Sequence, residues 1–127
     1  MSRLEFNLTF PPSTNNLFAN KKSGGRVPST KYKSWRAEAG WEINRQRLTL
    51  PNSMKGVPGD QLANVRILVN VARVSAARDL DNLIKPILDL LVNMQVLIDD
   101  TVKYVNLIEI RLSALDRPSD LLVIVAW

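Results

Sequence analysis

The sequence predicts an α+β fold: a small single domain in which a mixed β-sheet carries two main helices, in the order β-α-β-α-β-β. Three observations support this prediction. Alternating apolar and polar residues mark strands, two segments have the apolar spacing of helices, and turn residues separate these elements. Because 127 residues is within the usual size of one domain, we expect residues 1–127 to fold as a single unit.

The N-terminal part of the chain is expected to form one strand followed by a long loop. Apolar residues at every second position from Leu4 to Phe10 are typical of a strand with one buried face. Pro11-Pro12 ends this strand, because proline has no N–H to donate to a sheet. Residues 14–27 are polar and include Gly24-Gly25, which predicts a loop, and loops of this length commonly carry function.

The middle of the chain is expected to hold a helix and a strand. Ser29 or Thr30, which directly follow a proline, are suitable N-caps for a helix that runs to about Leu48. Residues 50–61 contain two prolines and two glycines and predict a second loop, whereas the alternation in residues 65–72 predicts a strand. One face of the helix carries the residues Tyr32, Trp35, Ala39 and Ile43.

The C-terminal part is expected to add a second helix and two strands. Pro86 should distort the first turn of this helix or delay its start to about Asn82 or Leu83. The final segment, residues 121–127, is almost entirely apolar, which is typical of a strand buried on both faces. The helix is predicted by the spacing of Leu83, Ile87, Leu90, Leu91 and Met94. The strand from Val102 to Leu112 is expected to have on one side Val102, Tyr104, Ile108 and Ile110.

The composition excludes several kinds of chemistry. The chain contains no cysteine and no histidine, so thiol nucleophiles, disulfides, cysteine zinc sites and a histidine general base are all excluded. Any catalysis must therefore use carboxylates, lysine or a metal-activated water. No segment resembles a signal peptide or is apolar enough to span a membrane, so we expect a cytoplasmic protein with no membrane partner.

Positive charge is concentrated near the N-terminus. The net charge of the whole chain is +5. The first 60 residues contain ten basic residues and four acidic ones, so they account for all of the positive excess. Such a segment suits a polyanion such as DNA, because neutralising phosphates releases counterions. It also occurs as a face that only keeps a protein soluble. The densest part, from residue 20 to 36, has no acid and contains Lys21, Lys22, Arg26, Lys31, Lys33 and Arg36.

The acids most suited to chemistry lie around residue 80. In an extended chain Asp79 and Asp81 point to the same side, with side-chain origins ~6.6 Å apart. They can lean together onto one Mg²⁺, whose ligand oxygens lie at most ~4.2 Å apart. If the chain then turns helical, Lys85 projects from the same face as Asp81 and can stabilise charge on a phosphoryl oxygen.

Each of these residues also has a purely structural interpretation. Asp81 could be the N-cap of the helix, and Asp79 could simply favour its positive end. Lys85 could be a solvated helix lysine, and Asp99-Asp100 could be a polar turn. The sequence permits Asp100 to meet the first acid pair, but the residues alone leave this open.

Three motifs, taken in order, resemble the RusA family of crossover junction endodeoxyribonucleases. Residues 11–16, PPSTNN, are similar to the family's Pro-Pro-Ser-Asn-Asn turn, with Thr14 inserted. Residues 78–91, RDLDNLIKPILDLL, match its Arg-Asp-x-Asp-Asn helix start and its lysine. Residues 96–100, VLIDD, resemble its apolar-Asp-Asp step into a strand. Order and spacing agree, so the resemblance covers nearly the whole chain, as one RusA-like endonuclease domain.

The resemblance implies a magnesium-dependent endonuclease, with Mn²⁺ as a substitute, that resolves Holliday junctions in DNA recombination and repair. It implies that Asp79, Asp81 and Asp100 bind the metal, that Lys85 is catalytic and that Asp99 is secondary. Family members form homodimers that cut two opposing strands of a four-way junction, and prophages often encode them. Branched DNA is then the expected partner, contacted by Asn15, Asn16, Lys21, Lys22, Arg26, Lys31, Lys33 and Arg78.

The chain departs from the family pattern just before the central motif. Some members carry a run of arginines there, whereas this chain has Ser75-Ala76-Ala77-Arg78, so basic charge is hypothesised to have moved to the loop at residues 21–26. Two other functions remain open. One is a non-catalytic module that binds branched DNA and whose acids are structural. The other is a hydrolase of small nucleotides, which is disfavoured because the chain has no P-loop or Gly-rich phosphate cradle.

Overall fold

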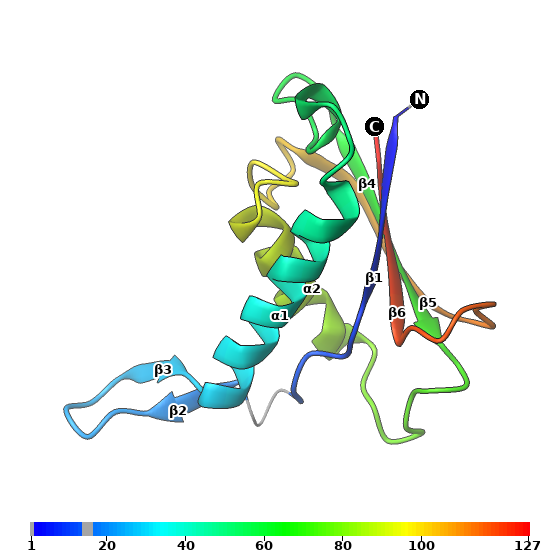
Figure 1. The fold of residues 1–127 in the computed structure, drawn as a ribbon. Helices are drawn as coiled ribbons and strands as arrows, with labels where there is room; N and C mark the ends of the chain where they lie inside the picture. Colours follow the sequence, from blue (N-terminus) through cyan, green and yellow to red (C-terminus); the bar gives the residue numbers. More distant parts are fainter. Residues whose placement is uncertain (1, 14–16) are drawn as a thin grey trace.

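The computed structural model describes residues 2–13 and 17–127 and has two layers, with two helices on one face of a four-stranded sheet (Figure 1). The strands lie in the order β1 (Arg3–Leu8), β6 (Leu121–Ala126), β4 (Ala63–Asn70) and β5 (Val105–Ser113). Strands β4 and β5 are parallel, whereas β6 is antiparallel to both of its neighbours. The expected α+β fold, with a mixed sheet and two main helices, is confirmed.

The core lies between the sheet and the helices. Phe6, Ile67 and Val123, which come from three different strands, are all at most 1% exposed on the helix side of the sheet. Strand β6 occupies a central position, and five of its six residues are buried, so the expectation of a strand buried on both faces is confirmed. Burying this apolar surface is the main stabilisation of the fold.

Helix α1 (Thr30–Arg47) begins as expected, because Ser29 is its N-cap and accepts a hydrogen bond from the backbone N–H of Tyr32 at 3.1 Å. A short 3₁₀ helix, η2 (Asn52–Met54), follows it. The helix approaches its neighbour closely at Gly40, where an added Cβ would lie 2.9 Å from the sulfur of Met94. The predicted apolar face is confirmed by the buried residues Tyr32, Trp35, Ala39 and Ile43.

Helix α2 (Asp81–Asn93) starts one residue earlier than the sequence indicated, with Pro86 inside it. The proline is tolerated one turn into the helix, where its missing N–H removes only one backbone hydrogen bond and its ring is buried. The predicted apolar spacing is confirmed, because the residues at these positions are buried or pack against the core: Leu83, Ile87, Leu90, Leu91 and Met94.

Two expectations about the connections were wrong. The loop predicted for residues 14–27 instead contains a hairpin of β2 (Phe18–Asn20) and β3 (Arg26–Pro28), whose turn has positive φ angles at Gly24 and Gly25. The strand predicted from Val102 begins only at Val105. Residues 101–104 form a turn in which the N–H groups of Tyr104 and Val105 both donate to the carbonyl of Thr101, and Val102 is 93% exposed.

None of the helices within the described ranges combines the length and the apolar character that crossing a membrane requires.

Candidate functional site

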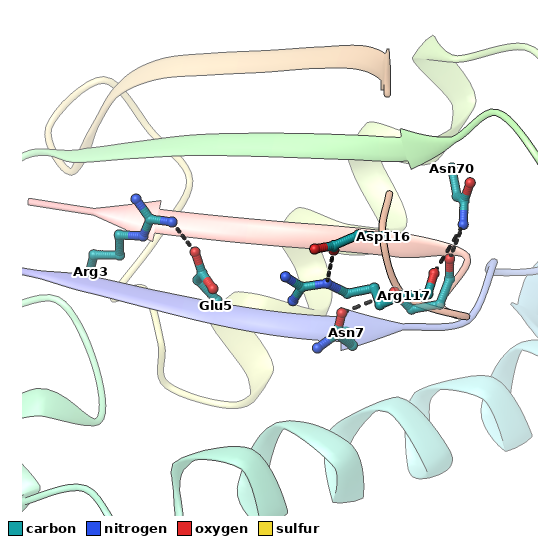
Figure 2. A network of polar contacts seen from close by, with 7 residues as sticks. Arg3, Glu5, Asn7, Asn70, Asp116 and Arg117 are labelled. Carbon is teal, nitrogen blue, oxygen red and sulfur yellow. Dashed lines mark hydrogen bonds and ion pairs between the residues drawn. The ribbon is translucent and has the colours of Figure 1, made fainter. Parts of the chain in front are cut away.

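The loop that carries the central motif leaves the sheet at Asn70, the last residue of β4. The Asn70 side chain is 3% exposed and donates to the carbonyls of Ser119, at 2.9 Å, and Arg117, at 3.4 Å (Figure 2). Its own oxygen accepts from the N–H of Ala72 at 3.1 Å, and its backbone N–H donates to the carbonyl of Asp120. These bonds fix the direction in which residues 71–80 leave the sheet.

Arg78, the first residue of the motif, turns inward rather than toward solvent. Its guanidinium donates to the carbonyl of Pro11 and lies over the ring of Phe10, 5.3 Å from the centroid. The N–H of Phe10 in turn donates to a carboxylate oxygen of Asp120 at 3.0 Å. The pKa of Arg78 is lowered by burial, and the nearby charge of Asp120 offsets only part of this effect. Arg78 therefore ties the motif to the N-terminal proline turn, and its expected contact with DNA stays a prediction.

Asp79 and Asp81 point to solvent and neither caps helix α2. The residue at the N-cap position is Leu80, which supplies no side-chain hydrogen bond, so the structural interpretation of Asp81 as a cap is wrong. Asp79 accepts one long hydrogen bond, of 3.4 Å, from the side chain of Asn82. Within the described residues, no hydrogen bond or ion pair engages the carboxylate of Asp81. Both acids therefore keep most of their oxygen lone pairs available to a ligand.

Lys85 lies between two carboxylates that come from different parts of the chain. Its ammonium is 2.9 Å from Asp89, one turn further along α2, and 3.4 Å from Asp100, beyond the end of the helix. The carboxylate of Asp99 accepts from the backbone N–H of Asp100 at 2.8 Å, whereas the carboxylate of Asp100 faces Lys85. We call Lys85, Asp89 and Asp100 the Lys85 cluster.

The electrostatics of this cluster keep the lysine protonated. The hydrogen bond from Lys85 to Asp89 is the largest cause of a raised pKa of Lys85, and the charge of Asp100 adds to it. An ammonium in this state cannot accept a proton near neutral pH, but it can stabilise negative charge that develops on a nearby oxygen. The cluster therefore suits electrostatic catalysis rather than general-base catalysis.

Sequence reasoning missed one residue of the cluster, Asp89, and one residue near it, Tyr32. Asp89 was not considered, although its i,i+4 spacing from Lys85 on a predicted helix is a recognisable signal for an ion pair. Tyr32 was assigned only to the apolar face of α1. Burial is the largest cause of its raised pKa, and the charge of Asp89 raises it further while that of Lys85 lowers it. The first turn of α1 is therefore within electrostatic reach of the Lys85 cluster.

The carboxylates have the right chemistry for a hard divalent cation, but they do not form a closed metal cage. Mg²⁺ prefers carboxylate oxygens and usually keeps several waters, so one or two acids are enough to hold it. Asp81 lies one turn before Lys85, and Asp100 is ion-paired to the same lysine. In the ranges that the structure describes, no three Asp or Glu side chains gather closely enough to bind a metal as a group.

The basic residues lie on the hairpin and at the start of α1, the helix whose Tyr32 is within electrostatic reach of Asp89 and Lys85. In Figure 1 the β2–β3 hairpin projects away from the sheet beside the first turn of α1. At its base, Phe18 packs edge-on against Tyr32 at 5.8 Å, and the guanidinium of Arg26 covers Phe18 at 5.1 Å. Exposed cations extend from there, namely Lys21, Lys22, Lys31 and Lys33. The remaining expected DNA contacts, Asn15 and Asn16, lie outside the described residues.

Two surface hollows, of about 720 and 790 Å³, lie elsewhere on the molecule. The first is lined by β1, α1 and the turn before β6, and includes Trp41 and Glu38. The second lies between the end of α1 and the loop around Gly56. Neither hollow is lined by Asp79, Asp81 or Asp100, and the side chains of Asp79 and Asp81 are exposed. An open surface suits a long polymer better than a small nucleotide, which usually binds in a concave pocket.

Comparison with known proteins agrees with the motifs. A family model described as "Endodeoxyribonuclease RusA" matches residues 9–114 of the 127-residue chain. No curated protein matches the chain. The family match includes the proline turn, the central motif with Lys85 and the Asp99-Asp100 step, which are the segments that meet around α2. The resemblance drawn from the sequence is thereby confirmed, and the chain belongs to the RusA family of endodeoxyribonucleases.

Proposed function

We propose that this enzyme resolves four-way DNA junctions by magnesium-dependent hydrolysis of phosphodiester bonds, as a homodimer in the cytoplasm, in DNA recombination and repair. The observation that carries the proposal is the contact between Lys85 and Asp100, with 3.4 Å between the ammonium and the carboxylate. This contact joins the central motif to the Asp-Asp step, two segments on either side of the end of α2 that the family match includes.

In the proposed site, Asp79, Asp81 and Asp100 hold the metal ion. Asp79 and Asp81 are exposed and lightly bonded, so their oxygens can rotate onto a cation without breaking contacts that the fold needs. A bound Mg²⁺ would activate water and neutralise charge on the scissile phosphate, with Mn²⁺ as a substitute. Asp99 helps indirectly, because its bond to the N–H of Asp100 orients the neighbouring carboxylate.

Lys85 stabilises the negative charge that builds up on the phosphate during cleavage. Its side chain is 72% exposed and its ammonium is held by Asp89 and Asp100, so a phosphate can approach it from solvent. Because the raised pKa keeps Lys85 protonated, its charge is present throughout the neutral pH range. This charge would favour the transition state over the bound substrate, where less negative charge has accumulated.

The hairpin and the start of α1 hold the DNA by its phosphates. Their cations belong to a segment, residues 20–36, that contains no acid, and phosphate contacts give affinity and position rather than sequence readout. The proposed contacts are Asn15, Asn16, Lys21, Lys22, Arg26, Lys31, Lys33 and Arg78. Arg78 contributes by holding the motif loop against Pro11.

A homodimer would supply two such sites related by a two-fold axis. A four-way junction has two opposing strands to cut, and closed two-fold symmetry is the commonest arrangement of soluble oligomers. Each protomer would then cut one strand, and paired cuts would separate the junction into two duplexes.

The test is cleavage of a synthetic four-way junction with and without Mg²⁺, using the wild type, Asp79→Asn and Asp81→Asn. We expect paired nicks only for the wild type with Mg²⁺, while both variants still bind the junction. Asp116→Asn is the matched control, because this acid is 90% exposed on the turn before β6 and should cut normally.

Two results would count against the proposal. Normal cutting by Asp79→Asn and Asp81→Asn in Mg²⁺ would contradict the proposed metal ligands. Junction binding by the wild type with no nicking in either Mg²⁺ or Mn²⁺ would support the alternative, a non-catalytic module that binds branched DNA.

A further inference from the structure

The two edges of the sheet differ in how their backbone groups are satisfied. At the β1 edge, the side chain of Gln46 accepts from the N–H of Asn7 at 2.9 Å and donates to its carbonyl at 3.1 Å. The indole of Trp35 donates to the carbonyl of Thr9, just beyond the strand. Side chains from α1 therefore cap this edge and hinder the addition of another strand.

The β5 edge has no such protection. Strand β5 is nine residues long and pairs with β4 on one side only. The carbonyl of Ser113 accepts from Val71 of the segment after β4, so by alternation the N–H and C=O groups of Ile108, Ile110 and Leu112 face outward. Within the described residues, no side chain hydrogen-bonds to these outward groups. Ile108 is 40% exposed and Leu112 52%, although both lie on the helix side of the sheet.

The charges on β5 are arranged so that the strand complements itself. Glu109 and Arg111 lie on the open face of the sheet, opposite Arg66 and Leu68 of β4. Their contacts within the chain are long, at 3.8 Å from Glu109 to Arg66 and 3.7 Å from Glu109 to Arg111. In an antiparallel pair of β5 strands with a two-fold axis at Ile110, Glu109 of each copy faces Arg111 of the other.

This register satisfies the apolar and backbone groups as well. Ile108 then faces Leu112 of the other copy on the helix side, so two exposed apolar residues cover each other. The outward groups of these residues and of Ile110 fall opposite one another and can form about six hydrogen bonds, two for each facing pair. Moving the axis to Glu109 or Arg111 would instead place like charges directly opposite, which is unfavourable.

We propose that β5 is the surface through which two copies of this chain associate, as an antiparallel β5–β5 pair centred on Ile110 that makes one continuous eight-stranded sheet. The inference deepens the proposed homodimer and rests on it. It names a surface and a register that the nuclease motifs do not determine, because Glu109 and Arg111 lie outside all three motifs.

The test measures molar mass by light scattering for wild type, Glu109→Arg and Arg111→Glu, each alone, and for an equimolar mixture of the two variants. We expect wild type at twice the 14.3 kDa chain mass and each variant alone at 14.3 kDa, because each would face like charges. The mixture should recover twice the chain mass, because one chain then carries two cations at these positions and the other two anions. Recovery would also establish that both variants are folded. The matched control, Glu5→Arg on the capped β1 edge, should remain dimeric.

The outcomes separate the proposed surface from the proposed dimer. If wild type is dimeric and both single variants stay dimeric, or if their mixture stays monomeric, the β5 surface is wrong while the dimer stands. Loss of the dimer in Glu5→Arg would also overturn the β5 surface. A wild type that is monomeric at concentrations where it cuts a junction would contradict the proposed dimer itself.

Discussion

Asn70 lies directly before the motif loop and Lys85 lies one turn into the helix that follows it, but the surroundings of these two polar residues are opposite. Asn70 is 3% exposed, and both its side-chain groups and its backbone N–H are hydrogen-bonded. Lys85 is 72% exposed and is shared between Asp89 and Asp100. A fully bonded buried amide fixes the fold, because any change leaves groups unpaired. An exposed cluster with spare acceptors has little effect on the fold and remains available to a ligand.

The sharpest test of this contrast is Lys85→Ala. Because the ammonium is proposed to stabilise charge only in the transition state, we expect junction cleavage to fall by about 10²–10³-fold with little change in junction affinity. The free energy of unfolding should change by less than about 1 kcal/mol, because the ion pairs of Lys85 are exposed. Single-turnover cleavage and urea unfolding measure the two quantities.

Lys85→Arg is the control for charge, and it should recover part of the lost rate because the cation is retained. If Lys85→Ala cut the junction at the normal rate, Lys85 would be a solvated helix lysine, and the contrast with Asn70 would have no functional meaning.

Asn70→Ala should have the opposite profile. The change leaves the carbonyl of Ser119 and the N–H of Ala72 without partners, so we expect unfolding to become easier by about 2–3 kcal/mol in urea. Cleavage at a temperature where the variant is folded should fall much less than in Lys85→Ala. Asn64→Ala is the matched control on the same strand, because among the described residues its side chain bonds only to the exposed Asn106, and it should cost less than about 1 kcal/mol. An Asn70→Ala variant as stable as Asn64→Ala would contradict the structural role of Asn70.

The same contrast explains what could be predicted from the sequence. Apolar periodicity predicted both helices and the four main strands, because burial of one face decides those elements and is written directly into residues such as Ile43 and Ile87. Whether Asp100 meets the first acid pair was left open, because it depends on how the chain returns after α2, and the contact of Asp100 with Lys85 was not foreseen. The motif resemblance selected both residues, although residue spacing alone did not bring them together.

The failures came from local hydrogen bonding that has no apolar pattern. The hairpin that ends at Pro28 has three-residue strands of mostly exposed residues, so its sequence is that of a loop. The contact between Arg78 and the carbonyl of Pro11 was also missed, because no side-chain pattern can reveal a backbone partner. Val102 was placed in a strand because it is apolar, yet it is 93% exposed in a turn.

A smaller effect is expected for the basic hairpin, which is exposed like Lys85 but is proposed to affect DNA affinity rather than the cleavage step. Replacing Lys21, Lys22 and Arg26 together by alanine removes about three phosphate contacts, so the slope of log K against log salt should fall by about 2–3. Junction affinity near physiological salt should fall about tenfold or more, with stability unchanged. Filter binding over a salt series measures this. The control removes the same charge elsewhere, from Arg3, Arg66 and Lys103, and an equal loss of slope there would mean that the hairpin has no special part in binding.

The smallest effect is expected for Asp89, the acid of the Lys85 cluster that is not a proposed metal ligand. Asp89→Asn removes the closer partner, so the pKa of Lys85 should fall toward its ordinary value while the ammonium stays charged near neutrality and turns to Asp100. An exposed i,i+4 pair is worth about 0.3–0.5 kcal/mol, so stability should fall only slightly and cleavage should change by less than about threefold. Asp100→Asn should instead abolish cleavage, because this carboxylate is proposed to bind the metal. Equal loss of cleavage in the two variants would place Asp89 inside the site, and the metal would then have a different set of ligands.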